Sequence, residues 1–592
     1  MSETTLSQDR LADFTRDVRL LMLSAMALVI GTISAFVAWA LVSLISLITN
    51  LAYYQRLSLA PASPADNHLG YWAVVIPVIG GLIIGVMARY GSAKIRGHGI
   101  PEALEAILIG RSRIEPKVAV LKPVSSAVSI GTGGPFGAEG PIIMTGGAFG
   151  SLFAQLFHLS SAERKTLLVA GAAGGMAAIF AAPVAAVLLA VELLLFEWKP
   201  RSFIPVTIAA ATAAAVRVPL LGAGPIFPVT PHDPVNATLL GLAVLVGVIA
   251  GLASGGLTAL VYGFEDLFGK LPIHWMWWPA IGGLFVGIGG LIEPRALGVG
   301  YDVIHSLLRG ELIGAALVGL LIVKALIWAI ALGSGTSGGV LAPLLIMGGA
   351  LGAMEAHWLP AGDVSLWAMV GMAAMMAGTM RSPLTAIVFT LELTHDLNVL
   401  PALMVGAIAA EAVTVLLLRR SILTEKVARR GHHISREYSV DPYQLLRVGA
   451  VMDDKVPVVL GTMSVTELAD RIAHHDPDLT RHQATMAVDE HGNLAGVITR
   501  SALHRALNAD NAAETSVIEA ANCNPIVTYP DELLSDALAK MVRNDIGRLP
   551  VVSRDDPHHL VGYLGRSQVI AARLRQIEEE HVREPGWLTG TA

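Results

Sequence analysis

Residues 131 to 151 read GTGGPFGAEGPIIMTGGAFGS, a stretch that combines eight glycines with one charge, the carboxylate of Glu139. Apolar sequence extends far on both sides of it. Glycine lets the backbone bend sharply, and a proline such as Pro141 is tolerated in the first turn of a helix. The stretch therefore predicts a helix that begins inside an apolar environment and carries a carboxylate at its N-terminus.

Two further segments share this design, GHGIP at 97–101 and GGVLAP at 338–343. Each places glycine just before a proline and an apolar run, so we predict three helix N-termini exposed within a membrane. Such ends carry unpaired N–H donors and the positive end of the helix dipole, and together they attract anions. Several converging ends would bind a small anion without a full buried cation, which suits transport because a tightly held ion cannot leave.

The carboxylate of Glu139 is itself an anion. It would occupy the anion site when ionised and vacate it when protonated or displaced, so we predict that Glu139 is a gate. The alternative is a simple cap on a helix that starts at Gly140. Carboxylates within a membrane are costly unless they have a function, which favours the gate.

The composition indicates a membrane protein. Of 592 residues, 54% are hydrophobic and only 15% are charged, and the mean hydropathy is +0.61. A single cysteine, Cys523, excludes an internal disulfide and any CxxC metal or redox motif. The net charge of -6 gives no basic surface for nucleic acid. We predict a multi-pass transport protein in the lipid bilayer, with no enzyme activity and no metal site.

The chain changes from apolar runs to mixed polar sequence near residue 418. We predict a membrane domain at 20–432, in halves of about 20–220 and 235–432, between a short segment at 1–19 and a linker at 433–449. Two soluble units follow at 450–510 and 511–575, then a tail at 576–592. The junction RRSILTEKVARRG at 419–431 is rich in Lys and Arg, which predicts that the soluble units are cytosolic. The polar N-terminal segment lacks the order of a signal peptide and is expected to be cytosolic too.

Both regions contain internal repeats. PIIMTGGAFG from Pro141 matches PLLIMGGALG from Pro343, and in a second pair of blocks Pro183 and Pro383 each precede a glutamate by nine residues, Glu192 and Glu392. Small-residue motifs recur in many packed membrane helices, but the shared spacing favours a duplication. Duplicated transporters place their substrate site between the halves. Each soluble unit reads as helix, strand, turn, strand and helix.

The motifs GHGIP, GAEGP and GVLAP, in this order, resemble the signature segments GSGIP, G(R/K)EGP and GxFxP of the CLC chloride channels and chloride/proton exchangers. The helix RSPLTAIVFTLELT and the paired CBS units also match that family. The resemblance covers about residues 20–575. It implies a mainly α membrane fold with inverted halves and broken, tilted helices, followed by an α/β CBS pair. It also implies a homodimer with one pore per subunit, in the inner or plasma membrane with both termini cytosolic.

The resemblance assigns the anion site to the three motifs and the last membrane helix. The implied residues are Gly97, His98, Gly99, Ile100, Pro101, Gly137, Ala138, Gly140, Gly339, Val340, Leu341 and Leu423. Several depart from the family pattern. The pore serine falls on His98, whose imidazole would donate an N–H when neutral and attract anions when charged; a packed histidine, with backbone amides binding the ion, is the alternative. Ala138 replaces a basic residue, Leu341 replaces phenylalanine, and Leu423 replaces the pore tyrosine.

The family's exchangers pass protons through an inner glutamate, and this position falls on Leu193, which cannot relay a proton. Glu192 matches the preceding acid, and Glu197 lies one helical turn further, so these two are the candidates for a proton path. Lys122 matches a family lysine. It would either support the anion field at a distance or extend its ammonium to the membrane interface.

CBS pairs of this family can bind adenine nucleotides through an acid that follows a Ser or Thr by three residues. Ala502 and Gln568 stand at these positions, so we expect a structural or dimerising role and no cofactor. The predicted function is a chloride channel with a glutamate gate and weak or no proton coupling. The alternatives are a chloride/proton antiporter using another internal acid, a fluoride-selective variant, and a CBS-bearing divalent-cation transporter, which would need acids converging on the pore. A sensor without transport would not need three glycine-broken helix starts.

Overall fold

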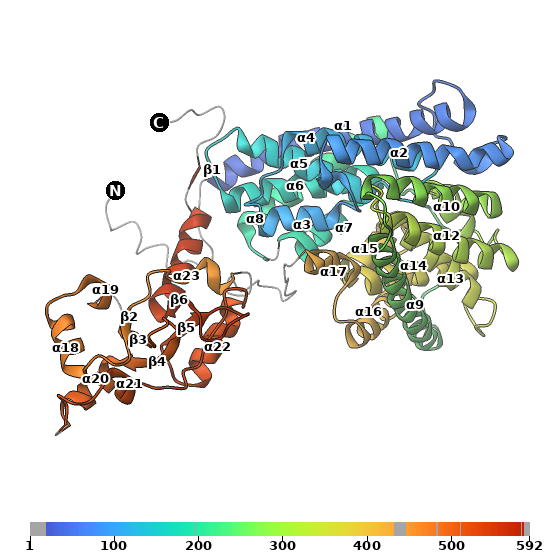
Figure 1. Cartoon of the computed structure of the whole chain (residues 1–592). Coiled ribbons are helices and arrows are strands. Elements are labelled where there is room, and N and C mark those ends of the chain that lie inside the picture. The colour runs from blue at the N-terminus through green and yellow to red at the C-terminus, as the bar shows by residue number, and fades with distance from the viewer. Residues whose placement is uncertain are drawn as a thin grey trace. The chain divides into compact units, whose positions relative to one another are not determined.

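The computed structural model describes residues 19–195, 197–430, 446–480, 483–509, 511–581 and 583–584, which form two compact units (Figure 1). Of the described residues, the first unit contains 19–195, 197–430 and 583–584, and the second contains those from 446 to 581. The predicted N-terminal segment and most of the predicted linker fall outside the described residues. The predicted domain boundaries therefore stay predictions.

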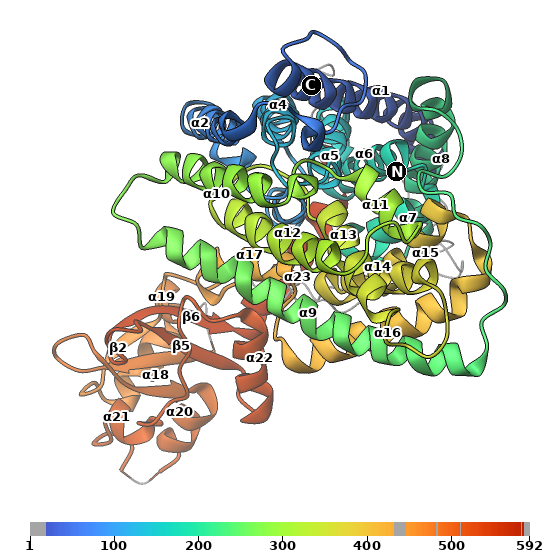
Figure 2. The same ribbon diagram turned by 90° about the vertical axis from the view of Figure 1, so that its right-hand side faces the viewer.

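The first unit consists of two helical halves that repeat one order of elements (Figure 2). The first half contains α1 (Arg19–Tyr54), α2 (Val75–Tyr90), α3 (Ile100–Leu108), α4 (Pro116–Gly131), α5 (Glu139–Gln155), α6 (Ser161–Phe180), α7 (Pro183–Leu189), the π-helical η6 (Ala190–Leu195) and α8 (Pro200–Leu221). The second contains α9 (Ala237–Gly269), α10 (Trp278–Ile292), α11 (Tyr301–Leu308), α12 (Ala315–Gly333), α13 (Leu341–Glu355), α14 (Val364–Met380), α15 (Pro383–Thr394), α16 (Leu400–Leu417) and then α17 (Ile422–Arg429). Short 3-10 turns join some of these: η3 (Pro64–Asp66), η4 (Gly70–Val74), η5 (Ala93–Ile95), η7 (Trp275–Trp277), η8 (Pro294–Ala296) and η9 (Leu397–Val399).

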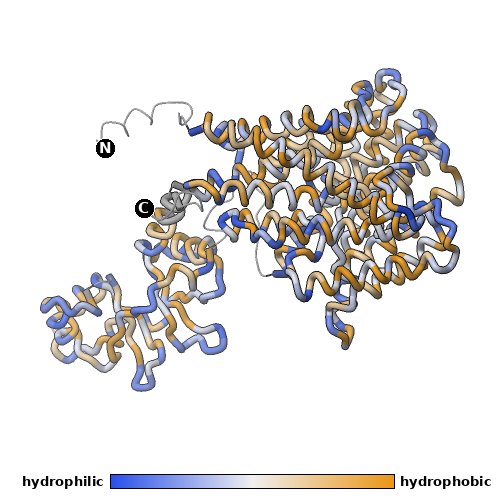
Figure 3. The backbone as a smooth tube through the Cα atoms, turned by 90° about the horizontal axis from the view of Figure 1, so that it is seen from above, coloured by the Kyte–Doolittle hydropathy of each residue, from blue (hydrophilic) through white to orange (hydrophobic). Residues whose placement is uncertain are grey.

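Apolar residues predominate along these helices, and polar residues gather at their ends (Figure 3). Among the described residues, seven helices are long and apolar enough to cross a membrane. The helices that begin at the three glycine motifs, α3, α5 and α13, are not among these seven. The first unit thus confirms the predicted polytopic fold with broken helices.

Close backbone contacts repeat in the two halves. A Cβ atom on Gly146 of α5 would lie 2.3 Å from the carbonyl oxygen of Gly171 on α6. On the second-half pair, a Cβ on Gly348 of α13 would lie 2.4 Å from the carbonyl oxygen of Gly371 on α14. Any larger residue would separate these helices, so the matching glycines set the same spacing twice.

The second unit contains two α/β repeats. The first has β2 (Val458–Leu460), α18 (Val465–Ala473), α19 (Pro477–Thr480), β3 (Ala484–Val488), β4 (Leu494–Thr499) and α20 (Arg500–Leu507). The second begins with α21 (Val517–Ala520), which packs against the core of the first, and continues with α22 (Leu534–Arg543), β5 (Arg548–Val552), β6 (Leu560–Gly565) and α23 (Arg566–His581). Strand β3 pairs in parallel with β2 and antiparallel with β4, and β5 pairs antiparallel with β6. The predicted order of helix, strand, strand and helix is confirmed in both repeats.

Two details concern the predicted tail at 576–592. Helix α23 extends beyond residue 575, where the sequence predicts the end of the second repeat. The short strand β7 (Arg583–Glu584) pairs antiparallel with β1 (Leu159–Ser160) of the first unit. Residues 585–592 lie outside the described part of the chain.

Candidate functional site

The three glycine motifs lie together although they are far apart in the sequence. The N–H of Gly97 donates to the carbonyl of Thr336 at 3.3 Å. Gly137 and Gly339 exchange hydrogen bonds, at 3.3 Å and 2.9 Å. Because each motif directly precedes α3, α5 or α13, these contacts bring three helix N-termini to one place, as the sequence predicts.

The motif glycines make close backbone contacts. A Cβ on Gly140 would lie 1.8 Å from the carbonyl oxygen of His98, and Gly99 has a φ of 91° that favours glycine. The N–H of Gly99 donates to Glu102 Oε2 at 2.9 Å. The N–H groups of Gly97, Gly99, Gly137 and Gly339 are thus engaged within the protein. The anion-binding role assigned to the motif residues stays a prediction, and these four donors are not free for it.

Glu139 begins α5 and is fully buried. Its Oε1 accepts the N–H of Ala342 at 3.1 Å, in the first turn of α13, and in the described structure its Oε2 has no hydrogen-bond partner. Ala138, not Glu139, is the N-cap residue of α5. The Glu139 carboxylate therefore does more than cap its own helix, because it binds the N-terminus of α13 in the other half of the membrane unit.

Lys122 and Lys324 occupy equivalent places in the two halves. Lys122 Nζ donates to the carbonyls of Ile95 and Gly97 at 2.9 Å and 2.7 Å, just before α3. Lys324 Nζ donates to the carbonyls of Ala296 and Gly298 at 2.8 Å and 3.1 Å, just before α11. Both side chains are fully buried, so the expectation that Lys122 extends to the membrane interface is wrong.

The sequence interpretation missed two neighbours of Glu139, Lys324 and Tyr301, which both interact electrostatically with its carboxylate. A signal for Lys324 exists: it precedes Gly339 by 15 residues, as Lys122 precedes Gly137. Tyr301 is the counterpart of Ile100, since Gly298 and Gly300 repeat the glycines of the first motif. Its hydroxyl is buried and has no hydrogen-bond partner among the described residues.

His98 and Leu423 lie where the resemblance expects a serine and a tyrosine. His98 is 2% exposed, and within the described residues its Nδ1 has no hydrogen-bond partner. A buried polar atom of this kind is costly unless water or a ligand satisfies it, which favours a site over simple packing. Leu423 is buried in the first turn of α17. A hydroxyl still reaches that turn, because Tyr262 Oη donates to the carbonyl of Ile422 at 2.5 Å.

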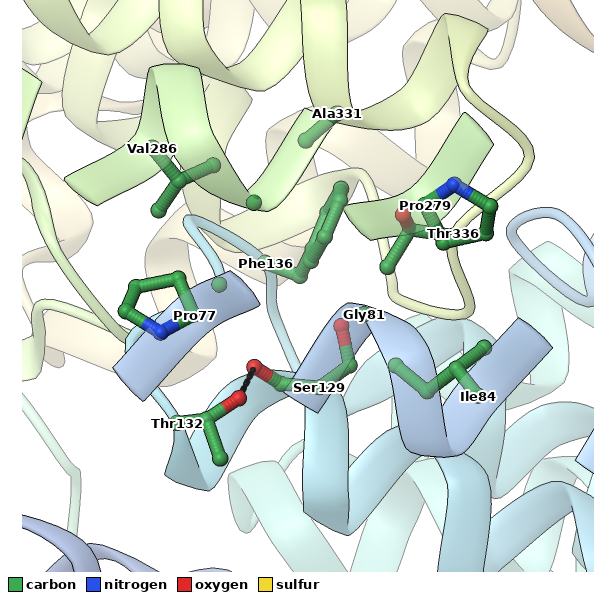
Figure 4. A pocket seen from close by; sticks show the side chains of 12 residues that line it. Pro77, Gly81, Ile84, Ser129, Thr132, Phe136, Pro279, Val286, Ala331 and Thr336 are labelled. Atoms are coloured by element: carbon green, nitrogen blue, oxygen red, sulfur yellow. Dashed lines mark hydrogen bonds between the residues drawn. The ribbon is translucent and has the colours of Figure 1, made fainter. Parts of the chain in front are cut away.

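Phe136 packs against the loop of the third glycine motif. Its ring lines a small cavity between α2, α4, α10 and α12, whose walls include Pro77, Ile84, Ser129 and Val286 (Figure 4). A Cβ on Gly338 would lie 2.2 Å from the ring. The ring therefore fixes the position of the third motif, and the cavity behind it is largely apolar.

Glu192 and Glu392 each cap the N-terminus of a helix in the opposite half of the membrane unit. Glu192 accepts the N–H groups of Leu384 and Thr385 at 3.1 Å and 2.8 Å, at the N-terminus of α15. Glu392 accepts those of Val184 and Ala185 at 3.0 Å and 2.7 Å, at the N-terminus of α7. These reciprocal caps join the two halves, so the geometry gives Glu192 a structural task.

We expect Glu192→Gln and Glu392→Gln each to lower the free energy of unfolding by about 1 kcal/mol, because each loses a charged cap at a helix N-terminus. Thermal unfolding of the purified protein measures this. Each variant is compared with the other, and the loss in Glu192→Gln should be at least as large, because Glu192 also accepts from the Thr385 hydroxyl at 2.6 Å. A variant that leaves stability unchanged but alters proton movement would contradict the structural role.

Glu197 is engaged in ion pairs, and its place on a proton path stays a prediction. It lies between η6 and α8, outside the spanning helices, and forms ion pairs with Lys165, Lys199 and Arg201 at 3.2 to 3.5 Å. Burial raises its pKa, but Lys165 and the other partners outweigh that effect and lower the pKa to about 2. A group that stays ionised at neutral pH does not take up protons from the cytosol. Leu193, at the expected relay position, is buried and apolar.

The linker between the halves is held by a histidine with two carboxylates. His232 Nδ1 lies 2.5 Å from Asp396 Oδ2, and its Nε2 lies 3.0 Å from Asp363 Oδ1. The hydrogen bond to Asp363, together with Asp396, raises the pKa of His232 from 6.5 to about 9 despite partial burial. The charged imidazole therefore ties the linker to the loops before α14 and after α15.

The pKa of His232 is higher in the folded than in the unfolded state. The stability that the charged imidazole gives the folded protein is therefore complete below about pH 6.5 and is lost as the pH rises through about 9. We expect His232→Gln to cost about 1 to 2 kcal/mol of stability near pH 6, reduced from the full linkage value because Asp363 is exposed. The difference from wild type should vanish near about pH 10. Thermal unfolding across this range checks it, with His274→Gln, a histidine that caps η7, as control. A difference that does not vary with pH would argue against the ion pairs.

The comparisons with known proteins agree with this architecture. The family profile described as voltage gated chloride channel matches residues 80–415, and the CBS domain profile matches 448–509 and 517–575. A ClcB-like protein of Ralstonia nicotianae is 30% identical over 355 residues, or 57% of this chain and 82% of that protein. The H(+)/Cl(-) exchange transporter ClcA of Salmonella paratyphi B is 29% identical over 437 residues, or 70% of this chain and 90% of that protein.

A solved structure of a slow cyanobacterial Cl-/H+ antiporter has the same fold, with a TM-score of 0.63 and 23% identity over 69% of this chain and 97% of that chain. The predicted mainly α membrane fold with a C-terminal CBS pair is therefore confirmed. The chloride channel profile alone matches more than half of the 592 residues. The chain belongs to the voltage-gated chloride channel family, the CLC proteins, and is a multi-pass membrane protein that transports anions.

Proposed function

We propose that the protein is a chloride channel gated by Glu139, with weak or no proton coupling. The observation that carries the proposal is the hydrogen bond from the N–H of Ala342 to the Glu139 carboxylate. A helix N-terminus is a binding place for an anion, and here an anionic side chain occupies it. A transported anion and the carboxylate would compete for that place, so movement of the side chain opens the path.

The arrangement on the proton path supports passive conduction. Leu193 replaces the inner proton acceptor, Glu192 is engaged in a cap, and Glu197 is held ionised by three cations. The second candidate is a chloride/proton exchanger, which the description of the Salmonella relative favours. Among the described residues no group of three or more His, Cys, Asp or Glu side chains could hold a metal ion, so no observation favours a divalent-cation transporter.

We further propose a homodimer in the inner or plasma membrane, with the N-terminus and the CBS pair in the cytosol. The basic run at 419–431 supports this orientation. For the CBS pair we propose a structural or dimerising role without nucleotide. In support, the hydroxyl of Thr499 already caps α20 by accepting the N–H of Ala502 at 3.1 Å, and Gln568 accepts the N–H of Gly565 at 3.1 Å.

The test is anion flux from vesicles that contain the purified protein. Chloride efflux under a voltage set by a potassium ionophore is expected, and it should stop when chloride is replaced by gluconate. Replacing chloride by fluoride distinguishes the chloride channel from a fluoride-selective variant. Vesicles that release no anion, beside a working positive control, would overturn the proposal.

A further inference from the structure

A group of charged side chains surrounds the backbone next to His98. Glu102, which is 5% exposed, forms its centre. Its Oε1 lies 3.1 Å from Arg430 Nη2 and 3.4 Å from Lys426 Nζ, while its Oε2 accepts the N–H of Gly99. We call Lys122, Lys426, Arg430, Glu102 and Glu105 the His98 charge cluster. It joins α3 and α4 of the first half to α17 at the end of the membrane unit.

Lys426 and Lys122 are the two cluster cations that lie against the first motif. A Cβ on Gly97 would lie 1.9 Å from Lys426 Nζ, so the ammonium rests against the backbone immediately before His98. The carbonyl of the same glycine accepts from Lys122 Nζ at 2.7 Å. Lys426 also lies one turn beyond Leu423 on α17, so the two side chains share a face of that helix.

The cluster carries one positive charge in excess, because three cations face the carboxylates of Glu102 and Glu105. The Lys426 side chain is only 15% exposed, so water screens its charge weakly. Glu102 attenuates that charge without removing it, since the same carboxylate also binds Arg430 and Gly99. The sequence interpretation expected no full buried cation near the transported anion. Because Lys426 shares the Glu102 carboxylate with Arg430, its ammonium can attract an anion and still bind it only moderately.

We propose that Lys426 is the residue that sets anion affinity in the part of the anion pathway beside His98. Its ammonium attracts a small monovalent anion to the backbone beside His98, whose buried Nδ1 has no hydrogen-bond partner among the residues that the structure describes. It thereby replaces the hydroxyl that is missing at Leu423. Glu102 limits the affinity so that the ion can leave. This inference rests on the proposed anion transport and adds the residue that tunes it.

Radioactive chloride exchange into vesicles, measured over a range of equal internal and external chloride concentrations, tests the role of Lys426. Lys426→Met should raise the concentration for half-maximal exchange about fivefold, and Lys426→Arg should restore it. Glu102→Gln keeps an acceptor for the Gly99 N–H but removes the opposing charge. It should lower the half-maximal concentration about threefold and reduce the maximal rate, because the ion leaves more slowly.

Arg430→Met is the matched control, since Arg430 is the other cation on Glu102 but is 38% exposed. If loss of a partner for the buried carboxylate were the cause, Lys426→Met and Arg430→Met would have equal effects, and the inference would fail. It would also fail if the half-maximal concentration did not change in Lys426→Met while wild type exchanged chloride normally. Absence of exchange in wild type would instead refute the proposed function. Thermal unfolding of each variant identifies any that is misfolded.

Discussion

Glu139→Gln should raise chloride flux at neutral pH by about tenfold and remove its dependence on pH. Glutamine cannot become an anion, so it no longer competes for the N-terminus of α13, where the Glu139 carboxylate accepts the N–H of Ala342. In wild type, acidification should increase flux by protonating the gate. The measurement is chloride efflux from vesicles at several pH values between about 3.5 and about 7.5, a range that spans the ordinary titration of a glutamate carboxyl group.

Glu355→Gln is a suitable control for that experiment. Glu355 is also a buried glutamate, 7% exposed, and it lies at the opposite end of α13. The same change in charge there should leave the pH response of flux in place. Glu139→Ala removes the side chain altogether and should behave like Glu139→Gln. Wild-type rates and pH dependence in both Glu139 variants would contradict the gate.

A chloride gradient should not drive protons uphill through this protein. An exchanger needs a side chain that takes up protons from the cytosol, and the family resemblance places the apolar, buried Leu193 at that position. Sealed vesicles with a chloride gradient and a pH-sensitive dye report the proton movement. Under a combined chloride and pH gradient, the reversal potential should follow chloride alone.

The Salmonella relative described as an H(+)/Cl(-) exchange transporter is the positive control for these vesicles. Stoichiometric proton pumping by the present protein would overturn the uncoupled channel and make it an exchanger. Glu192→Gln and Glu197→Gln would then separate the two candidate relays. A relay role for Glu197 would require its ion pairs with Lys165 and Lys199 to open, because they hold it ionised.

Local sequence patterns were sufficient for the helix starts and for the repeated architecture. The order of glycine and proline predicted the starts of α3, α5 and α13 within a few residues. Such patterns act over a single turn, where backbone freedom and the missing N–H of proline decide the outcome. The repeat of strands and helices in the CBS pair was also predictable, because each element shows its own periodicity.

Partners of the charged side chains were not predictable in this way. The sequence places Glu192 beside Leu193 and suggests a proton path, whereas the fold uses it to cap α15, 192 residues away. The equal spacing of Lys122 and Lys324 from Gly137 and Gly339 shows that Lys324 repeats Lys122, but only the structure shows that its ammonium binds the carbonyls before α11. A lone charge in an apolar segment does not reveal which distant group satisfies it.

The sequence by itself determined that this chain enters a membrane as two similar halves, with three glycine-broken helix starts and a carboxylate at one of them. These features depend on interactions within a few residues along the chain, so the local sequence is enough to predict them. Only the tertiary structure decided that the Glu139 carboxylate reaches α13, that Lys426 rests against Gly97, and that the halves exchange caps. Each of these contacts joins residues about 200 or more positions apart, and packing of the two halves selects such partners among many side chains of the same kind.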